Sequence, residues 1–180
     1  FSAIQLRSVQ ENNVVLDMQK KIVSSAGLDE VYGSVENAMS NIKTLIIDLD
    51  KGQIVDINPD TYELSKELRE DGKYKFLSAE EDVASIKKRE KYSKIYIEYK
   101  DNKINTLILP VRGYGLWGIL YGYLAIEGDL NTVAGLEFYE HKETPGLGAE
   151  IDNPKWKALW KGKKIYQDNG EVSLKVIKGN

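Results

Sequence analysis

The sequence predicts an α+β fold, in which hairpins build mixed or antiparallel sheets that are flanked by helices, with one long helix at the N-terminus. Three observations support this class. Runs of β-branched and aromatic residues are joined by short turns such as Asp101-Asn102. Apolar residues at spacings of three and four indicate helices between these runs. No internal repeat, low-complexity tract or linker divides residues 1–180, which are therefore expected to form a single domain.

The N-terminal helix is predicted over residues 4–26, because Val15, Met18 and Ile22 recur on one helical face. Gly27 suits the left-handed residue that commonly ends a helix. The next predicted elements are a short helix at 31–41, a hairpin of strands 43–50 and 53–57 around Asp50-Lys51-Gly52, and a short helix at 61–70 after Pro59-Asp60.

A further helix is predicted to begin at Ser78, because Ser78 and Glu81 form a capping-box pattern. Acidic residues follow directly and basic residues come at 87–89, as the helix dipole favours, so this helix should reach about Lys91. Residues 94–100 alternate in the manner of a half-buried strand. The remaining predicted elements are strands at 104–111, 119–126, 136–139 and 172–176, a helix at 154–160 capped by Asn153-Pro154, and a turn at Asp168-Asn169-Gly170.

Composition excludes several classes of function. The 180 residues carry a net charge of −3 and no cysteine, with one histidine. Without cysteine there can be no disulfide, thiolate catalysis or cysteine-ligated iron–sulfur cluster, and a site with several histidine ligands is also excluded. The charge gives no indication of nucleic-acid binding, and no run of eighteen apolar residues is present.

Two glycine-interrupted loops are the candidates for a binding site. Residues 112–118 carry Tyr114 and Trp117, whose flat faces could stack on a ligand or equally fill the core beside a strand end. Residues 141–150 combine a proline with two glycines, so the backbone is bent and open to close approach. This second loop could present N–H groups to a flat or anionic ligand, or simply connect a strand to a helix.

Within the second loop, residues 143–148 read E-T-P-G-L-G, and this run resembles the signature of the FMN-binding domain family. Further blocks, in the same order, resemble the C-subunit family of the sodium-translocating NADH:quinone oxidoreductases (the Nqr complex). These blocks lie at residues 10–27, 77–82, 115–118, 121–125, 129–133, 153–156 and 160–164. The resemblance covers nearly the whole chain. Lys142 and Ala149 depart from it, since the family usually has glycine at both positions.

The resemblance implies FMN as the cofactor and a binding site without catalytic or metal-ligating residues. The implied cofactor-binding residues are Glu143, Thr144, Pro145, Gly146, Leu147, Gly148, Leu116 and Trp117. Leu147 would cover a face of the ring and the glycines would admit the backbone. Glu143 would either orient the loop or disfavour a reduced, anionic flavin. His141 is expected to be structural, because electron transfer needs no general base.

The family also carries a C-terminal S-G-A-T motif, whose threonine holds FMN through a phosphoester. This motif does not occur in the 180 residues, so the covalent attachment is expected beyond Asn180. The first residue is Phe1, and a single transmembrane helix is expected to precede it. By resemblance, residues 1–180 would be a soluble FMN-binding fragment of a single-pass protein of the bacterial inner membrane, on its periplasmic side.

The implied function is electron transfer within NADH:ubiquinone reductase (Na+-transporting), with no independent turnover by this fragment. The chain would receive electrons one at a time from an iron centre of neighbouring membrane subunits and pass them to a second FMN, towards ubiquinone. Its partners would be the other Nqr subunits. Two alternatives remain: the related G subunit of the Rnf complex, and a flavin-free scaffold domain of the same fold. The block at 77–82 and the long N-terminal helix favour the Nqr family.

Overall fold

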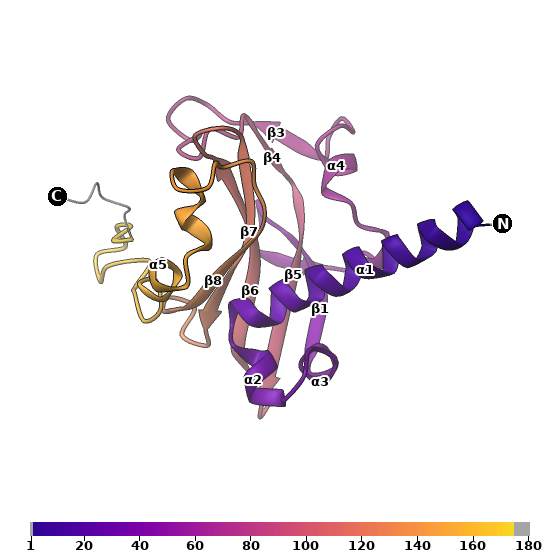
Figure 1. Cartoon of the computed structure of the whole chain (residues 1–180). Helices are drawn as coiled ribbons and strands as arrows, with labels where there is room; N and C mark the ends of the chain where they lie inside the picture. Colours follow the sequence, from indigo (N-terminus) through magenta and orange to yellow (C-terminus); the bar gives the residue numbers. More distant parts are fainter. Residues whose placement is uncertain (1, 175–180) are drawn as a thin grey trace.

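A computed structural model describes the backbone of residues 2–174 and the side chains of residues 7–174. Its centre is a six-stranded antiparallel sheet in the order β2-β1-β5-β6-β7-β8 (Figure 1). The six strands are β1 (Ile42–Asp48), β2 (Gln53–Val55), β5 (Tyr92–Lys100), β6 (Lys103–Tyr114), β7 (Ile119–Glu127) and β8 (Val133–Glu140). A separate two-stranded sheet contains β3 (Tyr74–Phe76) and β4 (Lys88–Glu90). The predicted α+β class is therefore confirmed.

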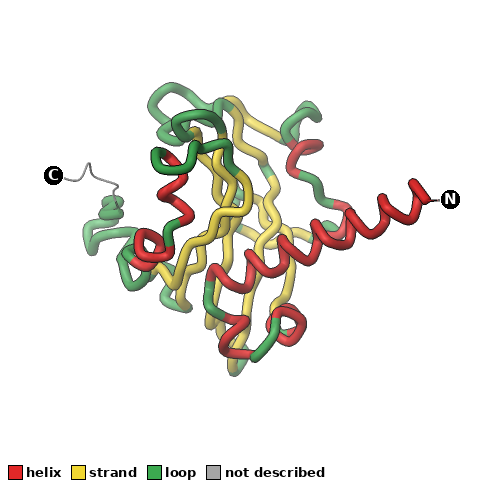
Figure 2. Tube along the Cα trace, in the orientation of Figure 1, coloured by secondary structure: helices red, strands yellow, loops and turns green. Residues whose placement is uncertain are grey.

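Helices flank the large sheet, and the longest of them crosses one of its faces (Figure 2). The helical elements are α1 (Ser2–Ser25), α2 (Leu28–Tyr32), α3 (Val35–Ser40), η1 (Pro59–Thr61), α4 (Leu64–Glu67), η2 (Gly148–Asp152) and α5 (Pro154–Ala158). The first part of α1 extends past the edge of the sheet, whereas its last turns lie on it. Among the described residues, no helix combines the length and the hydropathy needed to cross a bilayer.

The main core lies between the end of α1 and the sheet. Ile22 and Val23 of α1 pack on a row of paired residues that crosses four strands of the sheet. The row consists of Tyr96, Ile108, Ala125 and Gly135. Gly135 lies so close to α1 that a Cβ atom there would overlap the carbonyl oxygen of Ser25. The small residues of this row therefore determine how closely α1 can approach β8.

Replacing Gly135 with alanine should lower the free energy of unfolding by about 2 kcal/mol, because the helix must move away from β8 to admit the methyl group. Gly113→Ala is the matched control, since a Cβ there would make only an ordinary contact with Ala84, at 3.6 Å. Urea denaturation of both variants measures the difference. A loss at Gly135 no larger than that at Gly113 would show that α1 is not closely fitted to the sheet.

A buried carboxylate holds the short helix α2 against the far end of the sheet. Glu98 on β5 is 1% exposed, and it accepts hydrogen bonds from the Tyr32 hydroxyl at 2.6 Å, Asn105 Nδ2 at 2.8 Å and Thr106 Oγ1 at 2.8 Å. Burial acts to raise the pKa of Glu98, but these three donors and the nearby Lys100 outweigh it and hold the pKa below its ordinary value.

Acid should therefore destabilise the protein in part through Glu98. A carboxyl group whose pKa is lower in the folded chain stabilises the fold above its ordinary pKa, near 4.5, and this stabilisation is lost as the pH falls through the folded-state value. The slope of the unfolding free energy against pH reports how many more protons the unfolded chain binds than the folded chain. In Glu98→Gln this slope should be smaller between about pH 5 and about pH 3, by the equivalent of up to one proton. Chemical denaturation across this range measures the slope, and parallel curves for the two proteins would contradict the expectation.

The predicted helix at 78–91 is wrong, although its capping pair forms. Ser78 Oγ accepts the Glu81 N–H at 3.2 Å and Glu81 Oε2 accepts the Ser78 N–H at 3.1 Å. The helix does not continue, because Asp82 accepts the N–H groups of residues 86 and 87, and Ser85 and Lys87 have positive φ angles of 54° and 65°. The chain then enters β4, which pairs with β3.

Other predicted elements differ in burial or length. The strand predicted at 94–100 exists within β5, but both of its faces are covered, since residues 95–98 are all buried. The helix predicted at 61–70 is reduced to η1 and α4, and the helix predicted at 31–41 is divided into α2 and α3. The strand predicted at 172–176 is represented by a single bridge between Tyr166 and Val172, and its end lies outside the described residues.

Candidate functional site

Two glycine-rich loops lie next to each other at one end of the large sheet. The first loop, residues 115–118, connects β6 to β7 after their last paired residues, Tyr114 and Ile119. The second, residues 141–147, leaves β8 after Glu140, which pairs with Tyr121 of β7. Strand pairing therefore brings together two segments that the sequence separates by more than twenty residues, and both contain predicted site residues.

Glu143 joins the two loops. Its side chain is turned inward and the residue is only 8% exposed. Glu143 Oε1 accepts the backbone N–H of Trp117 at 3.1 Å. No ion pair of this carboxylate is found among the described residues, so the charge is held by a backbone donor and close packing. We call the contact between Glu143 and the 115–118 loop the Glu143 clasp.

Glycines on both sides make room for the Glu143 clasp. A Cβ atom on Gly115 would overlap Glu143 Oε1 and lie 3.1 Å from Leu120 Cγ. A Cβ atom on Gly148 would overlap Glu143 Oε2. Gly118 differs, because a Cβ atom there would meet only the flexible Lys142 side chain at 3.5 Å. Gly115 and Gly148 are therefore required by the buried carboxylate, whereas Gly118 is not.

The tip of the second loop forms a tight turn that leaves its surface open. The carbonyl oxygen of Thr144 accepts the N–H groups of Leu147 at 3.1 Å and Ala149 at 3.2 Å. Gly146 has a φ of 79°, which a residue with a side chain rarely adopts. The N–H groups of Thr144 and Gly146 make no hydrogen bond to other described residues, so they remain free to meet a ligand.

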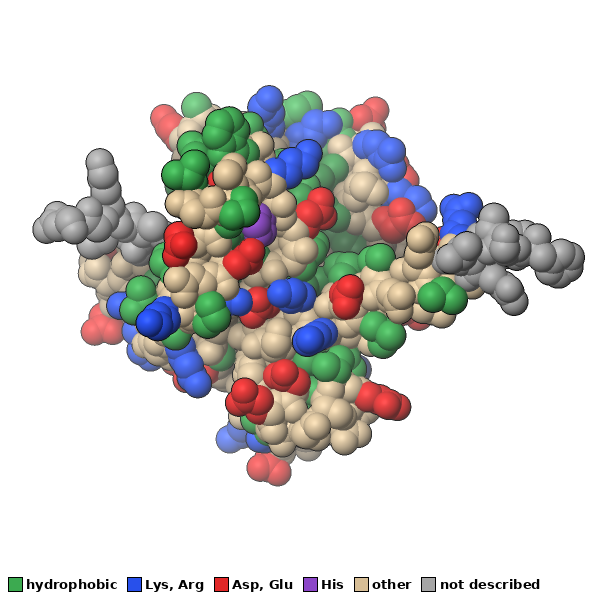
Figure 3. All heavy atoms as spheres, in the orientation of Figure 1, with side chains coloured by type: hydrophobic (Ala, Val, Ile, Leu, Met, Phe, Trp, Pro, Cys, Tyr) green, Lys and Arg blue, Asp and Glu red, His purple; other side chains and the backbone are tan. Residues whose placement is uncertain are grey.

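Apolar side chains at this end of the molecule are exposed to solvent. Trp117 is 58% exposed and Leu147 is 66% exposed, and Tyr114 and Leu116 are exposed to a similar degree. Of the two roles left open for Tyr114 and Trp117, stacking on a ligand or filling the core, their exposure excludes the second. Hydrophobic side chains gather at the upper left of Figure 3, over this end of the sheet. Such a surface is suited to covering a flat, largely apolar ligand.

The structure thus brings the eight predicted site residues together, with Glu143 turned inward and the others at or near the surface. A third segment also reaches this end, since Tyr114 donates its N–H to the carbonyl oxygen of Ala84 at 2.8 Å, and Val83 beside it is almost fully exposed. Sequence reasoning did not assign Gly115 or this segment to the site. The Gly-Leu-Trp-Gly run was the available signal for Gly115, and no local pattern indicated the contact with Ala84.

A separate cleft of about 170 Å³ lies on the sheet face between α1 and residues 62–73, which contain α4 and are called the α4 segment. The cleft includes none of the predicted site residues. Arg112 Nη1 and Glu90 Oε2 form an ion pair at 2.6 Å in its wall. Burial raises the pKa of Tyr96 and of Tyr139 to about 12, so both hydroxyls stay protonated at neutral pH. The tyrosines that line the cleft are Tyr62, Tyr96, Tyr121, Tyr123 and Tyr139.

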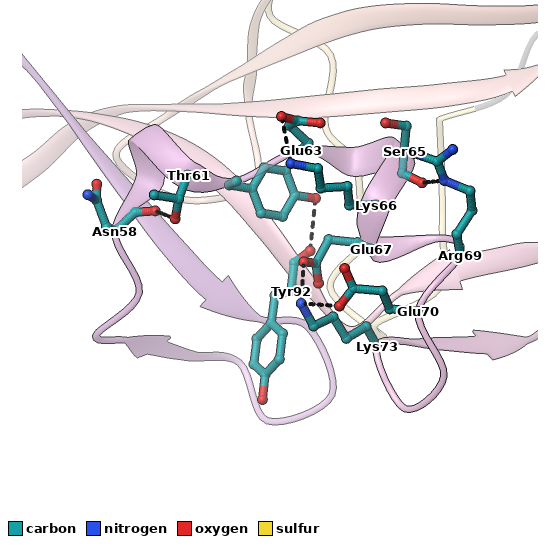
Figure 4. A network of polar contacts seen from close by, with 11 residues as sticks. Asn58, Thr61, Glu63, Ser65, Lys66, Glu67, Arg69, Glu70, Lys73 and Tyr92 are labelled. Carbon is teal, nitrogen blue, oxygen red and sulfur yellow. Dashed lines mark hydrogen bonds and ion pairs between the residues drawn. The ribbon is translucent and has the colours of Figure 1, made fainter.

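Polar contacts hold the α4 segment in place beside this cleft (Figure 4). Lys73 Nζ lies between two carboxylates, 2.7 Å from Glu70 Oε2 and 3.5 Å from Glu67 Oε1. The hydroxyl of Tyr62 donates to the carbonyl oxygen of Tyr92 on β5 at 2.9 Å. The segment is thereby fixed to the first residue of β5, a central strand, as a wall of the cleft, far along the chain from the two glycine-rich loops.

Comparison with known proteins places the two loops within a recognised domain. Residues 115–177 match the model of the FMN-binding domain. The chain is 48% identical to the C subunit of the Na(+)-translocating NADH-quinone reductase of Pseudomonas aeruginosa, over 99% of this chain and 70% of the relative. It is 39% identical to the corresponding protein of Vibrio vulnificus, with the same two coverages. The crystal structure of Shewanella oneidensis NqrC superposes with a TM-score of 0.80 at 30% identity, covering 91% of this chain and 76% of that one.

Proposed function

Because the chain belongs to the family of C subunits of the Na(+)-translocating NADH-quinone reductases, we propose that it relays electrons between redox centres of neighbouring subunits of that complex. FMN is its cofactor. The observation that carries the proposal is the pair of glycine-rich loops, joined by the Glu143 clasp and surrounded by exposed apolar side chains. A relay needs a flavin held near the surface, and this arrangement supplies an open surface at one end of the sheet.

The residues of the two loops fit a flavin. Leu116, Trp117 and Leu147 offer exposed apolar surface for the faces of the ring. The free N–H groups of Thr144 and Gly146 are suited to polar atoms at the ring edge. When bound, FMN supplies the redox chemistry, and the protein contributes binding, orientation and exclusion of water.

Glu143 acts as an orienting residue in this proposal. Its carboxylate accepts the Trp117 N–H and is enclosed by Gly115 and Gly148. A carboxylate used in this way sets the position of both loops, whereas a group that tunes the flavin by its charge would be directed at the ring. The inward side chain therefore supports loop orientation over a direct effect on the reduced flavin.

We further propose that FMN is attached through a phosphoester to a threonine of an S-G-A-T motif beyond Asn180, and that a transmembrane helix before Phe1 anchors the protein. The FMN-binding domain would then lie on the periplasmic side of the bacterial inner membrane, in a pathway that leads to ubiquinone. The partners would be the other subunits of the complex, as the names of the relatives imply.

The test is the intact mass of the full-length protein, produced together with its flavin transferase. We expect a gain of one FMN that survives denaturation and maps to a peptide beyond Asn180. Protein produced without the transferase is the control and should show no gain. No gain in the presence of a verified transferase would contradict the covalent attachment and favour a flavin-free scaffold role.

Residues 1–180 alone should bind FMN only weakly, with a dissociation constant above about 1 μM. A short covalent tether gives a millimolar effective concentration, so the ring contacts need not be strong in themselves. Calorimetric titration of FMN measures this affinity. Submicromolar binding would show that the loops hold the cofactor without help from a tether.

A further inference from the structure

His141 ties the start of the 141–147 loop to its end. Its Nε2 atom lies 2.5 Å from Asp152 Oδ2, in the last residue of η2. Its Nδ1 atom lies 3.2 Å from the backbone nitrogen of Glu143. The imidazole is mostly buried, with 18% of its side chain exposed. The imidazole therefore contacts Glu143, which forms the clasp, and also Asp152 of η2, the helical turn that begins at Gly148.

The hydrogen bonds determine the state of the ring. The Glu143 backbone N–H can only donate, so His141 Nδ1 must accept this hydrogen bond and carries no proton. The proton of the neutral ring is then on Nε2, where it is donated to the Asp152 carboxylate. Asp152 thereby holds the ring in the tautomer that leaves Nδ1 free to accept the Glu143 N–H.

We infer that His141 is a positioning residue of the flavin site, which acts through Glu143 on the placement of Trp117. The backbone N–H of Glu143 donates to His141, and the carboxylate of Glu143 accepts the N–H of Trp117. Glu143 therefore transmits the position of the imidazole to the 115–118 loop. The part of this inference that concerns the flavin rests on the proposed function. The part that concerns the loops rests on protein contacts alone.

Amide hydrogen exchange of the flavin-free full-length protein tests the loop part. In His141→Ala the N–H groups of Glu143 and Trp117 should exchange about tenfold faster, as expected for the loss of about one hydrogen bond. His141→Asn is the rescue variant, because an asparagine oxygen can accept the N–H two residues later. We expect exchange within about twofold of the parent protein in that variant.

Asp152 supplies a second pair of variants. Asp152→Ala should accelerate exchange at Glu143, since the ring loses the partner that selects its tautomer, whereas Asp152→Asn keeps an acceptor and should have little effect. NMR of the ring nitrogens should show an unprotonated Nδ1 in the parent protein. A proton on Nδ1, or unchanged exchange in His141→Ala, would overturn the inference.

The flavin part is tested in the FMN-loaded protein by the visible absorption spectrum and the midpoint potential. Both should shift in His141→Ala and return in His141→Asn. Faster amide exchange with an unchanged spectrum and potential would overturn the link to the cofactor. If the parent protein never holds FMN, the proposed function fails, while the exchange data still decide whether His141 positions the loops.

Discussion

Replacing Glu98 with alanine should lower the free energy of unfolding by about 3 kcal/mol, the largest effect on stability that we expect from a single polar residue of this chain. The carboxylate accepts hydrogen bonds from Tyr32, Asn105 and Thr106 in a site that is closed to water. Alanine removes all three acceptor contacts and leaves partly buried donors without partners. Because Tyr32 ends α2, the anchoring of that helix to the sheet should weaken as well.

Two variants separate this effect from the general cost of mutating a strand. Tyr32→Phe removes a single donor and should cost about 1 kcal/mol. Glu127→Ala changes an exposed glutamate on β7 and should stay within about 0.5 kcal/mol of the parent protein. Urea denaturation compares the three variants. A loss below about 1 kcal/mol in Glu98→Ala would mean that water replaces the carboxylate.

Alanine at Gly115 or at Gly148 should weaken FMN binding at least tenfold. Each added methyl group would occupy space taken by the Glu143 carboxylate, one from either side. Neither glycine has a positive φ, so alanine is compatible with the backbone and the effect is purely one of space. The carboxylate must move, the bond to the Trp117 N–H is lost, and the loops that carry Trp117 and Leu147 separate.

Gly118→Ala is the matched control, because it lies in the same loop as Gly115 and meets only the Lys142 side chain. Its affinity should stay within about twofold of the parent protein. FMN titration of residues 1–180 is the suitable measurement, since no covalent link can then hide a change in affinity. Equal affinity in all three variants would show that the clasp has no part in binding, and thermal denaturation would confirm that the variants are folded.

The candidate site could be located from the sequence because its signal is local. The E-T-P-G-L-G run is contiguous, and its glycines and proline restrict the backbone wherever the loop lies. The orientation of Glu143 could not be predicted in this way. An inward carboxylate requires a donor, and that donor is the backbone of Trp117, which strand pairing between β6, β7 and β8 brings into reach.

The wrong helix at 78–91 shows the opposite case, in which a correct local signal led to an incorrect element. Ser78 and Glu81 make the reciprocal bonds of a capping box. Those bonds stabilise one turn, but a short helix is only marginally stable unless tertiary packing supports it. Asp82 and the pairing of β4 with β3 compete for the following backbone and determine the outcome.

By itself the sequence determined the fold class, the hairpin turns, the end of the first helix and the positions of the two glycine-rich loops, because each depends on the conformational limits of a few neighbouring residues. Only the tertiary structure decided that both faces of β5 are covered, that Trp117 is exposed and that Glu143 faces inward. These features depend on which distant segments meet, and that follows from the strand order, which no local pattern specifies.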